Sequence, residues 1–257
     1  MIVDYHMHLR DPEERIDHSV EGIERFVEVA IERGVDEIGF TEHVYYFTAT
    51  RALWSLPYQL ERCLHDLETY VDAVVEAKRQ GLPVKLGLEV DWVGERQDEL
   101  AAVLDPYPWD YLLGSVHWID GLGVDQAPGI WADRSVDEVW AVYFAALGQL
   151  AASGHVDVLA HPDLAKIFGK RPAAIEYPPL DGVALEISTA GLHKPVGEIY
   201  PDQPMLAGHP PITLASDAHV PQDVGRDLDR GVEYARAAGY DTVTVFQGRR
   251  GRQEPLG

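Results

Sequence analysis

Cysteine is nearly absent from this chain, in which Cys63 is the only one among 257 residues. A single thiol excludes an intramolecular disulfide and a thiolate-based metal site. Cys63 lies in a helix-like stretch, where we expect a buried and chemically inert thiol. Any metal site in this protein must therefore be built from imidazole and carboxylate groups.

Positive charge is also scarce, because 21 Lys and Arg residues face 43 Asp and Glu residues, for a formal net charge of −22. Lys and Arg supply most of the affinity of proteins for a nucleic-acid backbone, so we expect no nucleic-acid partner. A negative surface repels other anions as well. A phosphate pocket here would need metal ions or a local cluster of basic residues.

Long apolar runs are missing too. The apolar stretch at 139–147 is too short to cross a bilayer, and the N-terminus lacks the basic and apolar regions of a signal peptide. We therefore expect a cytoplasmic protein without a membrane partner.

No Gly-rich loop of the GxxxxGK[ST] type is present, which argues against a P-loop nucleotide site. No linker divides the chain, so we expect one domain over 1–257. The sequence does not specify the oligomeric state.

Short apolar runs that end in metal-competent side chains are what this sequence has in abundance. In the first run, His6 and His8 stand one residue apart, and residues i and i+2 of a strand share a face. The pattern recurs along the chain: IVDYHMH at 2–8, EIGFTEH at 37–43, VKLGLEV at 84–90, YLLGSVH at 111–117, VDVLAHPD at 156–163 and ITLASDAH at 212–219.

The segments between these runs have helical periodicity. Ser19 is a predicted N-cap of a helix that ends near Arg33, and Ser135 and Glu138 form a capping-box pattern. We expect helices over 19–33, 57–79, 136–152 and 223–238, and an irregular tail over 248–257.

Alternation of strands and helices predicts an α/β fold with a parallel sheet, because parallel strands require crossover connections. Seven or eight such units in this length favour a closed, TIM-like (β/α) barrel, with an open doubly wound sheet as the alternative. The metal-competent residues follow most of the strands. In a barrel they would meet at the C-terminal rim, where barrel enzymes carry their chemistry.

Neutral imidazoles and carboxylates are the ligand set that suits zinc, iron or manganese. Nine candidates exceed the needs of one tetrahedral ion, so we expect two or three divalent ions, with Glu89 able to bridge two of them. The candidate ligands are His6, His8, His18, His43, Glu89, His117, His161, Asp217 and His219. His18 precedes a predicted helix, and Asp11 is the alternative to it.

The ordered set of motifs resembles that of the PHP (polymerase and histidinol phosphatase) family of metal-dependent phosphoesterases. The motifs cover residues 2–220 and are His6-Met7-His8, Glu42-His43, Gly87-Leu88-Glu89, Ser115-Val116-His117, His161-Pro162-Asp163 and Ser216-Asp217-Ala218-His219. The segment Leu185–Pro201 is similar to one in the histidinol-phosphatase branch.

The resemblance implies a distorted seven-stranded (β/α) barrel with a trinuclear site. It implies one ion held by His6, His8, Glu89 and Asp217, a second by Glu89, His117 and His161, and a third by His18, His43 and His219. Three departures from the family pattern stand out. The loop between His8 and His18 is longer than usual, Glu42 occupies a position where Asp is common, and His193 occupies a position where Arg is common.

The expected reaction is hydrolysis of a phosphate monoester by a metal-bound water, held through His6, His8, Glu89, His117 and Asp217. His193, Lys194 and Trp118 are the predicted substrate-binding residues. The resemblance favours L-histidinol phosphate as the substrate, in histidine biosynthesis. The alternatives are another small phosphorylated metabolite or nucleotide and, ranked last, a non-catalytic metal-stabilised binding module.

Overall fold

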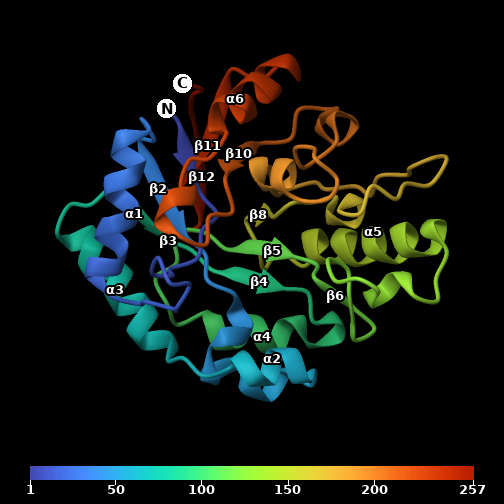
Figure 1. Ribbon diagram of the computed structural model, residues 1–257, viewed down its shortest axis with the longest axis horizontal. Helices are drawn as coiled ribbons and strands as arrows, with labels where there is room; N and C mark the ends of the chain where they lie inside the picture. Colours follow the sequence, from blue (N-terminus) through green and yellow to red (C-terminus); the bar gives the residue numbers. More distant parts are fainter.

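The computed structural model describes residues 1–257 and has an α/β fold. Short strands occupy the middle of the molecule, and helices surround them (Figure 1). The two ends of the chain lie side by side, where the backbone N–H of Gly257 donates to the carbonyl of Met1 at 3.1 Å.

Two parallel sheets form the centre of the fold. The first has three strands in the order β1 (Val3–Asp4), β2 (Glu37–Phe40) and β3 (Val84–Leu86). The second has five in the order β10 (Ile212–Ala215), β9 (Ala184–Ser188), β8 (Val158–Leu159), β5 (Leu113–Ser115) and β4 (Glu89–Asp91). Every neighbouring pair in both sheets is parallel, so the α/β expectation is confirmed.

The two sheets adjoin each other at both sides. At one side the chain passes from β3 to β4 through Gly87 and Leu88, and Glu89 N–H donates to the Glu42 carbonyl at 3.0 Å. A side chain at Gly87 would not fit, because a Cβ there would lie 2.8 Å from Thr41. At the other side Tyr5 N–H donates to the Leu214 carbonyl at 3.0 Å, which joins the end of β1 to β10.

Two helices begin where their capping residues predict. Helix α1 (Val20–Glu32) starts after Ser19, whose hydroxyl accepts from Gly22 N–H at 3.0 Å. Helix α5 (Val136–Ala152) starts with the predicted capping box of Ser135 and Glu138. These side chains satisfy backbone donors that the first turn of a helix leaves free.

Other helices differ from the predicted ranges. The segment 57–79 holds two helices, α2 (Pro57–Arg62) and α3 (Leu67–Arg79), because Cys63 leaves the helical conformation and Asp66 caps a new helix. Helix α6 (Leu228–Ala237) is shorter than predicted, and α4 (Gln97–Leu104) was not predicted.

The C-terminal tail is not irregular, which corrects the prediction. Strand β12 (Arg250–Pro255) pairs in antiparallel fashion with β11 (Thr242–Gln247). Its residues are mostly polar and exposed, so no apolar alternation marks it in the sequence. Backbone pairing with a buried strand orders this segment. A second hairpin joins β6 (Trp118–Ile119) to β7 (Leu122–Gly123).

The hydrophobic core is one contiguous cluster of 71 buried residues between the strands and the helices. No helix is long and apolar enough to span a bilayer. Polar residues are buried chiefly where the strands end, and among them His6, His8 and Glu89 are at most 1% exposed. Burial of so many polar groups is costly unless each has a partner, so it marks a functional centre.

Candidate metal centre

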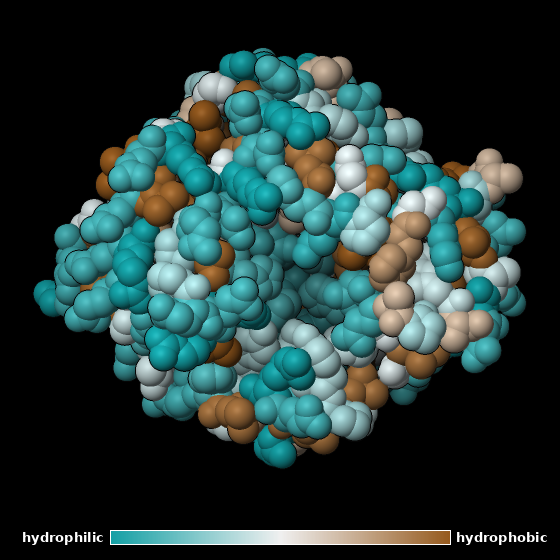
Figure 2. All heavy atoms as spheres, in the orientation of Figure 1, coloured by the Kyte–Doolittle hydropathy of each residue, from teal (hydrophilic) through white to brown (hydrophobic).

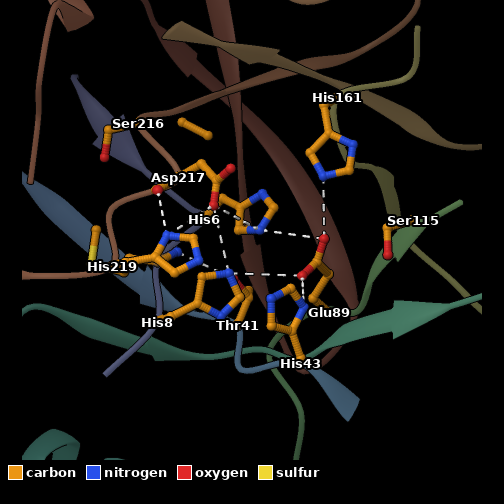
Figure 3. Close-up of polar contacts among 12 residues, drawn as sticks. His6, His8, Thr41, His43, Glu89, Ser115, His161, Ser216, Asp217 and His219 are labelled. Carbon is orange, nitrogen blue, oxygen red and sulfur yellow. Dashed lines mark hydrogen bonds and ion pairs between the residues drawn. The ribbon is translucent and has the colours of Figure 1, made fainter. Parts of the chain in front are cut away.

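Eight of the nine candidate ligands lie in or shortly after six of the strands and converge on one region. Figure 3 shows seven of them, with the carboxylates of Glu89 and Asp217 among the rings of His6, His8, His43, His161 and His219. His6 and His8 follow β1, His43 follows β2, Glu89 begins β4, His117 follows β5, His161 follows β8, and Asp217 and His219 follow β10. The structure thus brings together eight of the nine predicted residues.

Glu89 lies at the middle of this group. Its Oε1 is 3.5 Å from Nε2 of both His6 and His117, and 3.3 Å from Nε2 of His161. Its Oε2 faces the other way, 2.5 Å from Nδ1 of His43. A carboxylate whose two oxygens face different sets of imidazoles has the geometry of a bridge between two ions.

Asp217 closes the side of the group nearest β10. Its Oδ1 lies 3.6 Å from Nε2 of His6 and 3.6 Å from Nε2 of His8. Asp217 has a positive φ of 54°, and His161 one of 28°, both in the left-handed region. Such backbone conformations cost energy in non-glycine residues and concentrate at functional sites.

Several ligand atoms are buried without a hydrogen-bond partner, among them Nε2 of His6, Nε2 of His8 and Oε2 of Glu89. An unsatisfied buried polar atom costs roughly 1–3 kcal/mol, and a divalent ion would supply the missing contact. Four groups have ligand atoms within 4.8 Å of one another: His6, His8, Asp217; His6, Glu89, His161; His8, His43, His219; and His43, Asp91, His117. The side chains therefore fit a centre of more than one divalent ion.

Two buried carboxylates orient the imidazoles from behind. Glu186, in β9, places Oε2 2.8 Å from Nδ1 of His6, and its Oε1 accepts from the N–H of His161 at 3.1 Å. Asp91 places Oδ1 2.8 Å from Nδ1 of His117. When Nδ1 donates to a carboxylate, Nε2 is left free to bind a metal. Sequence analysis missed both residues. Glu186 could have been found, because it is a charged residue within the otherwise apolar run of β9.

The carboxylates shift the pKa values of the imidazoles around them. Burial disfavours the charged form of His117, but Glu89 and Asp91 outweigh it and raise its pKa to about 10. Burial, joined by the charge of His8, lowers the pKa of His219 to about 3. Burial opposes ionisation of Glu89 as well, yet the surrounding histidines hold the pKa of its carboxyl well below the usual range.

His18 is the ninth predicted ligand, and the structure does not bring it to His43 and His219. Its Nε2 lies 3.3 Å from Oε1 of Glu42, whose Oε2 is 3.6 Å from Nδ1 of His8. Glu42 therefore lies between His18 and the centre. The alternative ligand, Asp11, forms an ion pair with Arg15 at 2.6 Å instead.

A cavity of about 270 Å³ opens above the ligands. Figure 2 shows a hydrophilic hollow near the middle of this face of the molecule. Its lining includes six of the candidate ligands together with Trp118 and Lys194, two of the predicted substrate-binding residues. The other lining residues are Arg10, Tyr45, Tyr46, Tyr58, Asp125 and Gln126.

His193, the third predicted substrate-binding residue, does not line the cavity. Its Nε2 is 2.6 Å from Oδ2 of Asp227, and its Nδ1 is 2.8 Å from the guanidinium of Arg226. His193 ends a short 3-10 helix, after which the backbone of Lys194 is extended. The two neighbours therefore point to different places, and only Lys194 reaches the cavity.

Arg10 is a lining residue that sequence analysis did not name. It stands two positions after His8 in an extended segment, as His8 stands two positions after His6. The spacing that places both histidines on one face also applies to Arg10. The positive charge of Arg10, at the next position of this two-residue alternation, therefore indicated a cationic residue on the same face as the two histidines.

Comparisons with known proteins agree with this geometry. The model of the PHP domain family matches residues 4–190. The chain is 31% identical to a probable histidinol-phosphatase of Deinococcus radiodurans over 85% of this chain and 88% of that one. It is 27% identical to the histidinol-phosphatase of Bacillus subtilis over 79% and 89%.

A similar fold is found in the crystal structure of histidinol phosphate phosphatase from Lactococcus lactis subsp. lactis, solved with zinc, L-histidinol and phosphate. The TM-score is 0.72 with 20% identity, and the match covers 98% of each chain. The family model matches well over half of this sequence, and its motifs meet at one centre. This chain therefore belongs to the PHP domain family.

Proposed function

We propose that this protein is a metal-dependent phosphomonoesterase that hydrolyses L-histidinol phosphate to L-histidinol and phosphate. The observation that carries the proposal is the nearly full-length match to relatives named histidinol-phosphatase, one of them 31% identical. The Lactococcus protein of similar fold was crystallised with both products of this reaction.

Two ions have a complete set of protein ligands in this proposal. His6, His8, Glu89 and Asp217 would hold one, and Glu89, His117 and His161 the other. Ions of this class lower the pKa of bound water and neutralise phosphoryl oxygens. Glu186 and Asp91 keep the Nδ1 protons of His6 and His117 on the far side of the rings. A bound metal would displace the second ring proton and find Nε2 of each imidazole facing the centre, with zinc, iron and manganese as suitable ions.

The cavity wall supports a substrate with a cationic end. The ring centroids of Tyr58 and Trp118 lie 5.1 Å apart, and those of Tyr45 and Tyr58 lie 6.0 Å apart. Asp125 lines the same cavity with an exposed carboxylate. Aromatic faces and a carboxylate attract organic cations such as an ammonium or an imidazolium. Lys194 would bind the phosphate end.

We also propose that the two parallel sheets form one distorted (β/α)7 barrel and that residues 1–257 are a single domain. The hydrogen bonds of Glu89 with Glu42 and of Tyr5 with Leu214, at the two junctions of the sheets, support this arrangement. As an enzyme of amino-acid biosynthesis, the protein would act in the cytoplasm.

The proposed activity is tested by phosphate release from L-histidinol phosphate beside a panel of other phosphomonoesters, with Mn, Zn or Fe supplied. We expect kcat/KM for L-histidinol phosphate on the order of 10⁴ M⁻¹s⁻¹ or more, and well above that for the rest of the panel. Equal, weak activity on every compound would refute this substrate. Absence of any metal-dependent turnover would refute the phosphomonoesterase itself.

The role of the cavity wall is tested by Asp125→Asn. Loss of this charge should lower kcat/KM for L-histidinol phosphate several-fold and leave that for p-nitrophenyl phosphate, which has no cationic end, nearly unchanged. Asp133→Asn is the matched control, because Asp133 is exposed in the same loop and does not line the cavity. Equal losses on both substrates would contradict recognition of a cation by Asp125.

A further inference from the structure

Lys166 is a buried lysine that lies outside the groups of metal ligands and does not line the cavity. It ends the short 3-10 helix Leu164–Lys166 after β8, and its side chain is 0% exposed. The Nζ atom donates to Oδ2 of Asp163 at 2.9 Å, the carbonyl of Ile199 at 2.8 Å and Oδ1 of Asp202 at 2.7 Å. All three ammonium protons therefore have an acceptor, and two of the acceptors belong to a distant segment of the chain.

The distant segment closes a loop that carries Lys194. Ser188, at the end of β9, and Tyr200 exchange two backbone hydrogen bonds, of 2.8 and 3.0 Å, which join the two ends of this loop. Within the loop only a glycine fits at Gly191, because a Cβ there would overlap the carbonyl oxygen of Glu198. Lys194 lies in the middle of the loop and lines the cavity. The place of the cavity lysine is thus set by where this closed loop sits.

The third acceptor, Asp163, belongs to the loop of the metal ligand His161. The φ of His161 is 28°, a strained conformation that persists only where the surroundings hold it. Asp163 is fully buried and also accepts from the N–H of Asp202 at 2.8 Å. The ring of Tyr200 packs edge-to-face on the imidazole of His161 with centroids 6.3 Å apart, and its centroid lies 5.2 Å from Nζ of Lys166. The two loops therefore meet at a metal ligand, with Lys166 between them.

A buried ammonium is costly, and an apolar side chain would fill the same space without that cost. An apolar side chain would also let the two loops slide past each other, because hydrophobic contacts have no direction. The three hydrogen bonds of Lys166 are directional. A shift of the Ile199–Asp202 segment relative to Asp163 must break at least one of them and leave a buried polar group without a partner.

We propose that Lys166 is a positioning residue that fixes the loop of Lys194 relative to the loop of His161. It thereby sets the place of the cavity ammonium with respect to the metal ligands, although Lys166 itself contacts neither. The inference rests on the proposed function in one respect, which is the binding of a phosphate group by Lys194. It does not depend on which phosphate monoester is the substrate.

The test is a double-mutant cycle between Lys166 and Lys194 in the full-length protein saturated with Mn. The first change is the neutral-pair variant, Lys166→Met with Asp163→Asn, which removes both buried charges and keeps an acceptor for the N–H of Asp202. The second change is Lys194→Ala. Lys170→Met is the matched control, because Lys170 follows in the same loop, is exposed and lies outside the cavity. Calorimetry measures the binding of inorganic phosphate, and circular dichroism checks that each variant is folded.

In the wild-type background, Lys194→Ala should weaken phosphate binding roughly tenfold, as loss of a hydrogen bond to a charged group does. The neutral-pair variant should lose a similar factor, although Lys194 is still present. In the neutral-pair background, Lys194→Ala should change the affinity by less than about threefold, because a displaced ammonium has little left to contribute. Lys170→Met should bind phosphate like the wild type.

A full tenfold effect of Lys194→Ala in the neutral-pair background would overturn the inference, because a merely structural Lys166 would leave the contribution of Lys194 intact. Wild-type phosphate affinity of the folded neutral-pair variant, or of Lys194→Ala alone, would overturn it as well. If the neutral-pair variant does not fold, the same cycle with Asp202→Asn, at a half-buried position, decides the question. If L-histidinol phosphate proves not to be a substrate, the proposed function fails, while the phosphate titrations still decide the role of Lys166.

Discussion

Glu186 contacts one ligand of each proposed ion, His6 and His161. Its carboxylate is fully buried, accepts from Nδ1 of His6 at 2.8 Å and accepts from the backbone of His161 at 3.1 Å. Glu186→Gln keeps the shape of the side chain but turns one oxygen into a donor. If the remaining oxygen stays on His161, the amide N–H faces Nδ1 of His6. That nitrogen must then accept, which moves the ring proton to Nε2.

The Nε2 of His6 is the atom that faces Glu89 and Asp217, at 3.5 and 3.6 Å. A protonated Nε2 cannot bind a metal, so the variant must break a buried hydrogen bond or lose a ligand. Loss of an outer carboxylate of this kind lowers metal affinity 10–100-fold, which corresponds to about 1.4–2.8 kcal/mol. The affected ion is the one proposed at His6.

The assay is a zinc titration of chelator-stripped protein in competition with a chromogenic chelator. Glu176→Gln is the control, because Glu176 is an exposed carboxylate outside the cavity. Thermal unfolding followed by circular dichroism checks that the variant is folded. A folded Glu186→Gln protein with wild-type zinc affinity would refute the role of Glu186 in holding the tautomer of His6.

Three further predictions follow from the geometry. Lys194→Ala should raise KM for the phosphorylated substrate roughly tenfold, because Lys194 lines the cavity. His193→Ala removes a side chain that pairs with Asp227 outside the cavity, so it should leave KM nearly unchanged. Equal effects of the two substitutions in steady-state kinetics would contradict this difference. Lys166→Met should lower the free energy of unfolding by about 3–5 kcal/mol, because the ammonium of Lys166 is 2.9 Å from the buried carboxylate of Asp163. Urea denaturation measures this loss. A change below about 1 kcal/mol would be inconsistent with it. Metal binding at pH 7 should release protons, and metal affinity should increase as the pH rises. The reason is that Glu89 and Asp91 raise the pKa of His117 to about 10, so the metal-free imidazole carries an extra proton that a metal must displace. Calorimetry in buffers of different ionisation enthalpy measures this release, and a binding enthalpy that does not depend on the buffer would contradict it.

The sequence by itself determined the features that depend on local spacing. His6 and His8 lie on one face because a strand has a period of two residues. Ser19 and Ser135 begin α1 and α5 because their hydroxyls accept from backbone N–H groups within the next turn. The ends of parallel strands meet at one edge, so the order of the motifs predicted that nine ligands converge, and eight of them do.

Only the tertiary structure decided which residues complete the site. The direction of His18, on the far side of Glu42, depends on how the loop after β1 packs against the end of β2. His193 and Lys194 are adjacent in sequence, yet only one reaches the cavity, because a helix ends between them. Glu186 contacts His6 and His161, which belong to other segments of the chain. Contacts between distant segments have no period in the sequence, and the packed fold alone specifies them.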